Sequence, residues 1–466
     1  MVWLSGSLVL ASLLHLGAAE LSGRTGPTTS REAKIATKVC NILDHGGVAS
    51  RTADNGPAIA AAWAACRDGG EVYIPAGEYG LDTWVVLNKG QHVSLNIEGT
   101  IFRTGTTEGN MFLIRDSDDV EIYSSTGLGA IQGFGYEFHK DGKYGPRIMR
   151  LHNCTHFSVH DFVLVDSPAF HLTVESSSDG EVYNLVIHGG NEGGLDGIDV
   201  WGSNIWIHDI EVSNKDECVT VKSPADHILV ESVHCNWSGG CAMGSLSTGT
   251  NISNIDYRNI YTHHSNQLYM FKSRGGSGTV SSVTLDNFIG HNNAYGFDVD
   301  TNWLRQSVGA GAGVSYANIN VTNWKGSSRD DMQRAAVRVL CPAHVPCTNI
   351  EIHNVDIRNQ NGSPAVHVCD HAFGAGSCLT NVNELMEANS EGPVTKTFPQ
   401  TRLDTDMSTD AAPDFVQPML PNELKAPWNV SEPIPIPQMP ALFFPGIKPK
   451  SDVLARAHLQ SKGTSV

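Results

Sequence analysis

The chain is 466 residues long and strongly acidic, with a formal net charge of −18 at pH 7 and a sequence pI near 5.5. Proteins that bind nucleic acid present a large basic surface, so this charge argues against a nucleic-acid partner. A polyanionic glycan would instead need a local group of cations. Such a group occurs near the middle of the chain: Lys215, Lys222, Arg258, Lys272 and Arg274. For each of these residues, the alternative is an ordinary solvated side chain on the surface.

The N-terminus has the pattern of a secretory signal. An apolar run at residues 8–14 precedes the small residues 17–19, which are typical of a signal-peptidase site. We therefore expect residues 1–19 to be a signal peptide and the mature chain to begin near Glu20, with a buried N-terminal helix as the alternative. No later apolar run is long enough to span a bilayer. The sequence thus predicts a secreted, extracellular protein without a membrane partner.

The asparagine and cysteine patterns agree with export. Six asparagines precede a non-proline residue and then Ser or Thr, and are predicted glycosylation sites: Asn153, Asn236, Asn251, Asn320, Asn361 and Asn429. Ten cysteines in an exported chain indicate disulfides. Close spacing favours the first two of the four expected pairs: Cys341 with Cys347, Cys369 with Cys378, Cys40 with Cys66, and Cys218 with Cys235. Cys154 and Cys241 are then expected to be buried thiols.

A short phrase with one polar residue at a fixed place recurs between about residues 157 and 355. Its apolar and polar residues alternate, which is typical of a strand with one buried face. A unit of this length cannot bury its apolar face alone and must stack on its neighbours. Helical solenoids are excluded because apolar spacings of three and four are missing, so the sequence predicts an all-β protein, a parallel β-helix with about one coil per repeat. The polar residues are, in order, Asp161, Asn184, Asp209, Ser232, Asn259, Asn287, Asn323 and Asn354.

The segment before the repeats is predicted to cap the solenoid. Residues 57–66 have Pro57 in the first turn of a short helix, and Gly69 and Gly70 end it. A helix over the first coil would shield the open end of the solenoid. The first coils should then start with residues 72–79. The apolar stripe of the helix is Ile59, Ala62, Trp63 and Cys66.

The C-terminal part has a different composition. Prolines are frequent from residue 399 onward and reach near-alternate positions at Pro433, Pro435 and Pro437. This composition predicts that residues 399–466 form an extended or poorly ordered tail. The expected β-helix domain is therefore 20–398.

Two acidic pairs lie at the ends of consecutive predicted coils. The first is Asp196 with Asp199, and the second is Asp216 with Glu217. Hydrolysis of a glycosidic bond needs a carboxylic acid that protonates the leaving oxygen and a carboxylate that activates water. Stacked coils would bring these residues together, and close carboxylates raise one another's proton affinity. Because successive strand residues point to opposite faces, Asp216 and Glu217 converge only if a bend or strand end lies there.

Other chemistries fit the sequence less well. The pair His263 and His264 lacks helical spacing, and no metal or cofactor signature emerges. A calcium-dependent lyase would need a basic proton abstractor beside clustered calcium ligands, so the acids favour hydrolysis. A β-helix that binds a glycan without cutting it is the alternative outside enzymes, and only turnover separates the two.

The acidic segments resemble those of the polygalacturonase family of glycoside hydrolases, the inverting pectinases of family 28. LDGIDV at residues 195–200 is similar to the family's Asn-Thr-Asp-Gly-Phe-Asp-Ile, and NKDEC at residues 214–218 is similar to its Asn-Gln-Asp-Asp-Cys. The likeness covers residues 20–378 and implies a right-handed parallel β-helix.

The resemblance also implies a role for each acid. Asp216 is expected to be the general acid, Asp196 and Glu217 to hold the nucleophilic water, and Asp199 to contact substrate. The product anomer should be inverted. Inverting enzymes usually hold their carboxyl groups about 6.5–9.5 Å apart, so we expect that separation here.

Two departures from the family narrow the expected substrate. The family's Gly-His-Gly segment is replaced by CAMGS at residues 241–245, and its Arg-Ile-Lys segment by Met270, Phe271 and Lys272. Together with Asp-Glu in place of Asp-Asp, this most resembles the rhamnogalacturonan hydrolase branch. The resemblance implies endo cleavage of galacturonic acid–rhamnose linkages in the rhamnogalacturonan I backbone of pectin, with Lys272 pairing with a galacturonate carboxylate. Endo-polygalacturonase and xylogalacturonan hydrolase are the alternatives within the class.

Two further residues are candidates for the site. His291 is expected to replace the missing histidine in catalysis. His188 and His263 occupy the equivalent place in other repeats, so a structural row is the alternative. Trp303 is expected to offer an aromatic platform to a sugar ring, with a core or rim position as the alternative. No cofactor is expected, and the chain is expected to act as a monomer on a pectic polysaccharide.

Overall fold

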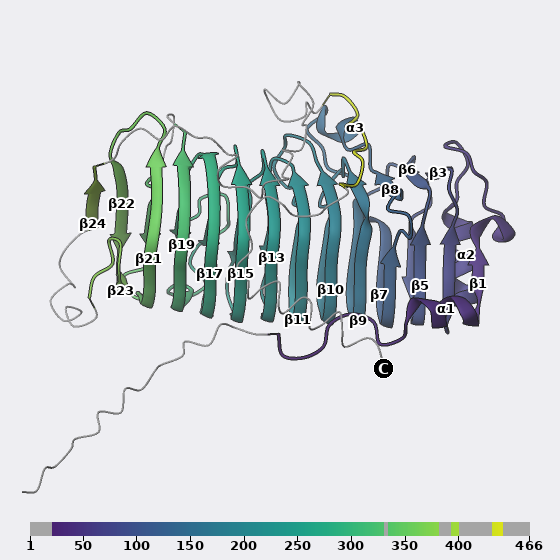
Figure 1. Cartoon of the computed structure of the whole chain (residues 1–466), viewed down its shortest axis with the longest axis horizontal. Helices are drawn as coiled ribbons and strands as arrows, with labels where there is room; N and C mark the ends of the chain where they lie inside the picture. Colours follow the sequence, from purple (N-terminus) through teal and green to yellow (C-terminus); the bar gives the residue numbers. More distant parts are fainter. Residues whose placement is uncertain (1–20, 330–333, 382–392, 400–430, 441–466) are drawn as a thin grey trace, which may run out of the picture.

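The computed structural model describes residues 21–329, 334–381, 393–399 and 431–440, whose strands stack into one long solenoid (Figure 1). The expected signal peptide lies outside these residues, as does most of the proline-rich tail. Within the described ranges, no helix has both the length and the apolar character needed to cross a membrane.

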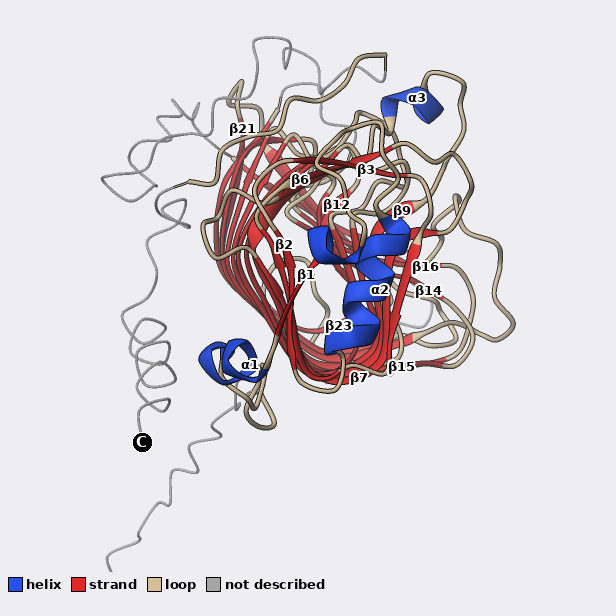
Figure 2. Cartoon of the chain, turned by 90° about the vertical axis from the view of Figure 1, so that its right-hand side faces the viewer, coloured by secondary structure: helices blue, strands red, loops and turns tan. Residues whose placement is uncertain are grey.

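One side of the solenoid is built from long parallel strands, each paired with the strand of the next coil. Figure 2, seen along the stack, shows the strands curling around a common interior. In order of pairing, the long strands are β7 (Asn110–Tyr123), β9 (Arg147–Val165), β10 (Leu172–His188), β11 (Ile198–Ser213), β13 (Ala225–Asn236), β15 (Thr250–His263), β17 (Gly278–Asn293), β19 (Ser315–Ser328) and β21 (Cys347–Asn359).

Shorter strands form a second parallel row, which starts from the first residues of β11 and carries the candidate acids. The row continues through β12 (Glu217–Val221), β14 (Gly240–Leu246), β16 (Tyr269–Ser273), β18 (Phe297–Asp300), β20 (Val337–Leu340) and β22 (Ala365–Asp370). The antiparallel strand β24 (Val394–Phe398) pairs with the last of these, and β23 (Ala372–Ala375) pairs with β21.

The N-terminal coils and cap use short elements. These are α1 (Arg31–Thr37), β1 (Val39–Asn41), a 3-10 turn (Ile42–His45), α2 (Gly56–Cys66), β2 (Gly70–Ile74), β3 (Glu78–Leu81), β4 (Val85–Asn88), β5 (Gln91–Ile97), β6 (Thr100–Arg103), β8 (Ala130–Gln132) and α3 (Tyr136–His139). Figure 2 shows α2 lying across the end of the solenoid. The expected stripe of this helix is buried in the main core, so the helix shields the first coil: Ile59, Ala62, Trp63 and Cys66.

The repeated polar residues occupy a left-handed bend in each long strand. Their φ angles all lie between 48° and 61°, a region that Asn and Asp enter more easily than most residues. Their side chains also bond between coils: Asn184 Nδ2 donates to Asp161 Oδ1 at 2.8 Å, and Asn287 Nδ2 donates to Asn259 Oδ1 at 2.7 Å. The phrase found in the sequence therefore marks the place where each coil turns around the interior.

Apolar residues between the bends point inward and stack in rows along the solenoid. Burial of these rows removes apolar surface from water, which is the dominant favourable term in folding. The coils begin before the first repeated phrase, because β2, β5 and β7 already pair in parallel. One row in register, buried throughout, is Val159, Val182, Ile207, Val230, Tyr257, Leu285, Val321 and Ile352.

The cysteines form the expected pairs. Disulfides join Cys40 with Cys66, Cys218 with Cys235, Cys341 with Cys347, and Cys369 with Cys378. Cys154 and Cys241 are free and buried. The covalent links therefore lie at the N-terminal cap, beside the acidic segment and in the last coils.

One predicted glycosylation site is incompatible with the fold. Asn236 has no exposed surface, and its Oδ1 lies 3.3 Å from His263 Nδ1, so a glycan has no room there. This corrects the prediction for that sequon. Asn320 is half-buried, and Asn429 lies outside the described residues; the remaining sequons are exposed: Asn153, Asn251 and Asn361.

A short piece of the tail, residues 431–440, lies against the outside of the solenoid and is drawn in yellow beside α3 in Figure 1. Gln132 Nε2 donates to the Ile434 carbonyl at 2.8 Å. The Ile434 side chain is 2% exposed and belongs to a small apolar cluster that is separate from the main core. Its buried partners are Ala130, Val163, Val165 and Val186.

Candidate active site

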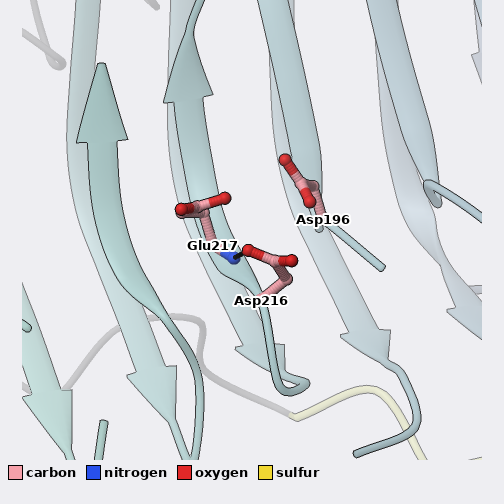
Figure 3. Close-up of side chains that lie close together, drawn as sticks. All are labelled: Asp196, Asp216 and Glu217. Carbon is pink, nitrogen blue, oxygen red and sulfur yellow. Dashed lines mark hydrogen bonds between the residues drawn. The ribbon is translucent and has the colours of Figure 1, made fainter. Parts of the chain in front are cut away.

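Asp196, Asp216 and Glu217 converge from adjacent coils (Figure 3). Asp196 precedes β11, and Glu217 begins β12, which pairs with β11. One oxygen from each carboxyl group lies within 4.8 Å of the other two. The bend required by strand geometry is present, because Asp216 lies in the turn just before β12. The two neighbouring acids therefore reach the same patch.

Asp216 is held by backbone groups. Its Oδ1 accepts a hydrogen bond from the Glu217 N–H at 3.0 Å, and its Oδ2 accepts one from the Gly194 N–H. The Asp216 carbonyl accepts from Ser238 Oγ at 2.9 Å and from the Gly239 N–H at 2.7 Å. Burial and then the charge of Glu217 raise the pKa of Asp216 to about 7. Asp216 therefore carries a proton in a mildly acidic medium, as a general acid requires.

Glu217 carries the negative charge of the cluster. Its Oε1 forms a hydrogen-bonded ion pair with Lys272 Nζ, and both side chains are about one-tenth exposed. Burial alone would raise the pKa of Glu217, but the ammonium groups of Lys272 and Lys222 hold it well below its usual range. The structure thus pairs Lys272 with Glu217, and a contact of Lys272 with a galacturonate carboxylate stays a prediction.

Asp196 and Asp199 share one lysine. Lys222 Nζ lies 3.5 Å from Asp196 Oδ2 and 3.2 Å from Asp199 Oδ1. Burial and then the charge of Asp199, followed by those of the other two acids, raise the pKa of Asp196 well above its usual value. Asp199 is only 1% exposed. Its carboxylate pairs with Lys222, and a contact of Asp199 with substrate stays a prediction.

The cluster combines an acid with a base. Asp216 holds a proton in mildly acidic solution, whereas Glu217 is ionised, and this division is what hydrolysis of a glycosidic bond needs. Lys222 and Lys272 already supply the positive charge that a cation would bring to three carboxyl groups. The arrangement therefore favours acid–base chemistry over metal binding.

The spacing of the carboxyl groups differs from the expectation. An approach of oxygens to within 4.8 Å is closer than the separation of about 6.5–9.5 Å that is usual for inverting enzymes. The reason is that Asp216 and Glu217 are consecutive residues, and Asp196 lies on the directly adjacent coil, whose strand is about 4.8 Å away. The expected inversion therefore rests on resemblance to the family and not on this distance.

Two residues that were not predicted donate hydrogen bonds to the backbone of the acidic segments. His171 Nε2 accepts a hydrogen bond from the Ser167 N–H at 3.3 Å, so Nδ1 carries the proton and donates to the Asp196 carbonyl at 3.1 Å. Asn214 Nδ2 donates to the carbonyl before Asp196 at 2.8 Å and to that of Glu217 at 3.2 Å. Asn214 lies in the NKDEC segment that resembles the family, so its sequence position could have indicated a role at the site. His171 lies outside every such segment.

Tyr144 reaches the site from the loop after α3. Its Oη donates to the Gly193 carbonyl at 2.5 Å, and the next residue, Gly194, donates its N–H to Asp216. Gly194 has a φ of +76°, and a Cβ atom there would lie 3.2 Å from the Tyr144 ring, so a glycine is needed for both reasons. The Tyr144 hydroxyl thus fixes the loop that holds Asp216. It lies 49 residues before its partner, and no sequence feature pointed to it.

His291 lies in a row with other polar residues. It is in register with His263 of the preceding coil, which is in register with Asn236. Its side chain is 3% exposed, and its ring centre lies 6.0 Å from that of Tyr261. His291 is not part of the group of three acids. The position fits the structural row that the repeats suggested, and a catalytic role stays a prediction.

Trp303 lies just beyond β18 and is half-buried. The backbone N–H of Trp303 donates to the Ser273 carbonyl at 3.0 Å. Trp303 therefore lies beside β16, the strand that carries Lys272. The guanidinium carbons of Arg334 and Arg305 lie 5.5 and 5.9 Å from its ring centre. Trp303 is therefore a surface residue of the strand row that carries the acids, and a sugar platform stays a prediction.

The structure brings two of the five expected cations to the acids, Lys222 and Lys272. Arg258 pairs with Asp256, and Arg274 Nη1 donates to the Gln306 carbonyl at 3.1 Å. Lys215 is exposed. Two of the five candidate cations are thus paired directly with the acids of the site.

Comparison with known proteins connects this site to carbohydrate hydrolases. The chain is 52% identical over 444 residues to Rhamnogalacturonase A from Aspergillus aculeatus, which covers 95% of this chain and 98% of that protein. It is 50% identical to Rhamnogalacturonase A from Emericella nidulans, covering 97% of this chain and 86% of that protein.

Solved structures share the fold at lower sequence identity. Endo-xylogalacturonan hydrolase from Aspergillus tubingensis is 20% identical, with a TM-score of 0.64 over 74% of this chain and 99% of that one. Polygalacturonase from Erwinia carotovora ssp. carotovora is 17% identical, with a TM-score of 0.52 over 72% and 96%. Residues 67–378 match the family described as Glycosyl hydrolases family 28. Because this match spans most of the chain, the protein belongs to glycosyl hydrolases family 28.

Proposed function

We propose that the protein is a secreted hydrolase that cuts galacturonic acid–rhamnose linkages inside the rhamnogalacturonan I backbone of pectin. The observation that carries this proposal is the 52% identity to a rhamnogalacturonase across nearly the full length of both chains. Four disulfides support export, because such bonds persist in oxidising compartments. The protein acts on the polysaccharide as a monomer.

In the proposed reaction, Asp216 and Glu217 work from opposite protonation states. Asp216 gives its proton to the leaving glycosidic oxygen as the bond to the anomeric carbon breaks. Glu217, kept ionised by Lys272, takes a proton from the water whose oxygen forms the new bond to that carbon. Asp196 orients this water. The water enters opposite the leaving group, so the product anomer is inverted.

The pKa values of the two acids define the pH range of activity. The rate falls as the pH rises through about 7, because Asp216 loses the proton that it must donate. It also falls at low pH, where Glu217 becomes protonated, and the lowered pKa of Glu217 moves this limb to strongly acidic solution. The expected profile is a bell with its maximum in mildly acidic medium.

Product analysis on several polymers tests the substrate assignment. Purified protein is incubated side by side with rhamnogalacturonan, homogalacturonan and xylogalacturonan, and the products are followed by chromatography and proton spectroscopy. We expect the fastest cleavage on rhamnogalacturonan, a broad range of early fragment lengths and an inverted first anomer. Faster cleavage of homogalacturonan would assign an endo-polygalacturonase instead. Turnover of none of the polymers would leave a glycan-binding β-helix.

A further inference from the structure

A second charged group lies further along the row of short strands that carries the acids. Lys272 on β16 is in register with Asp300 on β18, and Asp298 is in register with Arg338 on β20. Arg338 donates to both oxygens of Asp298 at 2.9 Å and to Asp300 Oδ2 at 2.7 Å. Arg334 Nη1 donates to Asp298 Oδ2 at 2.5 Å. The group is therefore continuous with the lysine that neutralises Glu217.

The two arginine side chains are more exposed to solvent than the carboxylate of Asp298 that they bind. The Asp298 side chain is 1% exposed, whereas those of Arg334 and Arg338 are 25% and 20% exposed. A buried carboxylate thus fixes two guanidinium groups while part of each faces solvent. Such a fixed, planar donor group suits a carboxylate ligand, because guanidinium N–H groups match carboxylate oxygens in geometry and charge.

Aromatic rings complete this surface. The guanidinium carbon of Arg334 lies 4.5 Å from the ring centre of Tyr295 and 5.5 Å from that of Trp303. Tyr295 is itself held, because its Oη donates to Gln267 Oε1 at 2.8 Å. Trp303 is half-buried and lies just beyond β18, at the surface of the strand row. An aromatic face beside fixed cations matches a sugar that carries a carboxylate.

The distance of the two arginines from the acids determines which sugar of a bound polymer they can contact. β12 connects to β20 through four successive strand pairings, by way of β14, β16 and β18. At about 4.8 Å per pairing, the arginines lie roughly 19 Å along the solenoid from Glu217. A polysaccharide backbone laid along the row would therefore reach them several sugar rings away from the bond that is cut.

We propose that Trp303, Arg334 and Arg338 form a distal subsite that binds one galacturonate residue of the polymer. The uronate carboxylate meets the solvent-facing N–H groups of the two arginines, and the pyranose ring lies against Trp303. This inference rests on the proposed function, since it assigns the sugar bound at one end of the same strand row. It gives an acidic protein a local cationic contact for an acidic polymer, far from the reacting bond.

A length series of oligosaccharides that alternate galacturonic acid and rhamnose tests the subsite. We expect Arg334→Gln to raise KM about fivefold for oligosaccharides long enough to reach β20, because one charge-assisted contact is lost. KM for oligosaccharides too short to reach β20 should rise far less. Arg358→Gln is the matched control: Arg358 pairs with Asp356 on β21, with both side chains exposed, and both KM values should stay at the wild-type level.

A second variant and a modified substrate distinguish loss of the subsite from misfolding. Trp303→Ala should produce the same length-dependent rise in KM, and thermal unfolding reports whether either variant is simply misfolded. With carboxyl-reduced oligosaccharides, Arg334→Gln and wild type should have equal KM at every length. Equal KM for both proteins on long acidic oligosaccharides would overturn the subsite while leaving the proposed function intact. If wild type cleaves none of these oligosaccharides, the proposed function itself fails.

Discussion

Asp216 and Glu217 are neighbours in the chain, yet their pKa values move in opposite directions. Glu217 accepts from a lysine two coils away, so its negative charge is compensated. The same negative charge, together with burial, keeps the proton on Asp216. The two protonation states are therefore linked: Lys272 and Lys222 stabilise the ionised base, and burial together with the charge of that base stabilises the neutral acid.

Replacing Asp216 should separate activity from stability. Asp216→Asn keeps the shape of the side chain but cannot donate the catalytic proton, so we expect kcat to fall by about two to four orders of magnitude. The folded-state pKa of about 7 lies above the ordinary value of about 3.9, so the folded protein binds more protons than the unfolded chain between these pH values. The contribution of Asp216 to the free energy of unfolding therefore falls as the pH rises from about 4 to 7.

Asp216→Asn cannot ionise at this position, so the variant does not lose this part of the free energy of unfolding as the pH rises. We expect Asp216→Asn to melt at a higher temperature than wild type at pH 8 and at nearly the same temperature at pH 4, measured by thermal unfolding. Near-wild-type turnover would remove Asp216 from the acid role. A lower melting temperature at pH 8 would show instead that the ionised Asp216 is well compensated in the fold.

Tyr144 gives a second residue-scale prediction. Tyr144→Phe removes the hydrogen bond to Gly193 and loosens the Gly194 N–H that lowers the pKa of Asp216. We expect kcat to fall about three- to tenfold, as for one neutral hydrogen bond, and the basic limb of the kcat/KM profile to move to higher pH. Tyr136→Phe in the preceding helix α3 is the control. A rise in KM with an unmoved basic limb would make Tyr144 a sugar contact and not a positioning residue.

The sequence predicted the acids and named Lys222 and Lys272 among five candidate cations, but it did not predict which acid each lysine contacts. Asp196, Asp216 and Glu217 lie in short segments with a family pattern, so local sequence was enough. Lys272 and Glu217 are 55 positions apart in the chain, so their contact depends on the lengths of two coils. Loop lengths vary between repeats, so the register that brings these two side chains together cannot be deduced from the sequence alone. The same limit applies to Tyr144.

At the scale of the repeating element, each coil turns at left-handed bends. Asn287 has a φ of 60°, and its side chain bonds to Asn259 in the coil before. Asn287→Gly should lose only the side-chain bond, about 1 kcal/mol of unfolding free energy. Asn287→Val should lose the same bond and add the strain of a β-branched residue in this region, about 1–3 kcal/mol more. Denaturant unfolding of the two variants measures the difference, and equal destabilisation would assign the whole effect to the bond.

Only one of the two bends in each coil could be read from the sequence. The second bend uses Asp or Asn at seven of eight positions, so its pattern is regular. A first bend lies five residues earlier and includes two histidines and a serine, which obscures the repeat: His156, Asp179, Asn204, His227, Asn254, Ser282, Asn318 and Asn349. The fold class followed from apolar alternation. The shape of each coil depends on bends that several residue types tolerate.

At the scale of the whole molecule, a piece of the C-terminal tail packs on the solenoid more than 240 residues from its nearest strand partners in the chain. The frequent prolines predicted an extended chain, and residues 431–440 contain no helix or strand. What composition could not predict is where this segment docks. Ile434 fills an apolar cluster on β8, β9 and β10, and its backbone bonds to Gln132 and to Asp166.

This contact predicts unequal effects of two C-terminal deletions. Removing residues 431–466 exposes the apolar cluster and should lower the free energy of unfolding by about 2–3 kcal/mol, the scale of one fully buried isoleucine. Removing only residues 441–466 keeps Ile434 in place and should change it little. Thermal unfolding and limited proteolysis of both proteins measure the difference. We expect turnover per folded molecule to stay close to wild type in both, because the acids are held by the coils themselves. Equal stability of the two truncated proteins would mean that the docked segment contributes nothing to the fold.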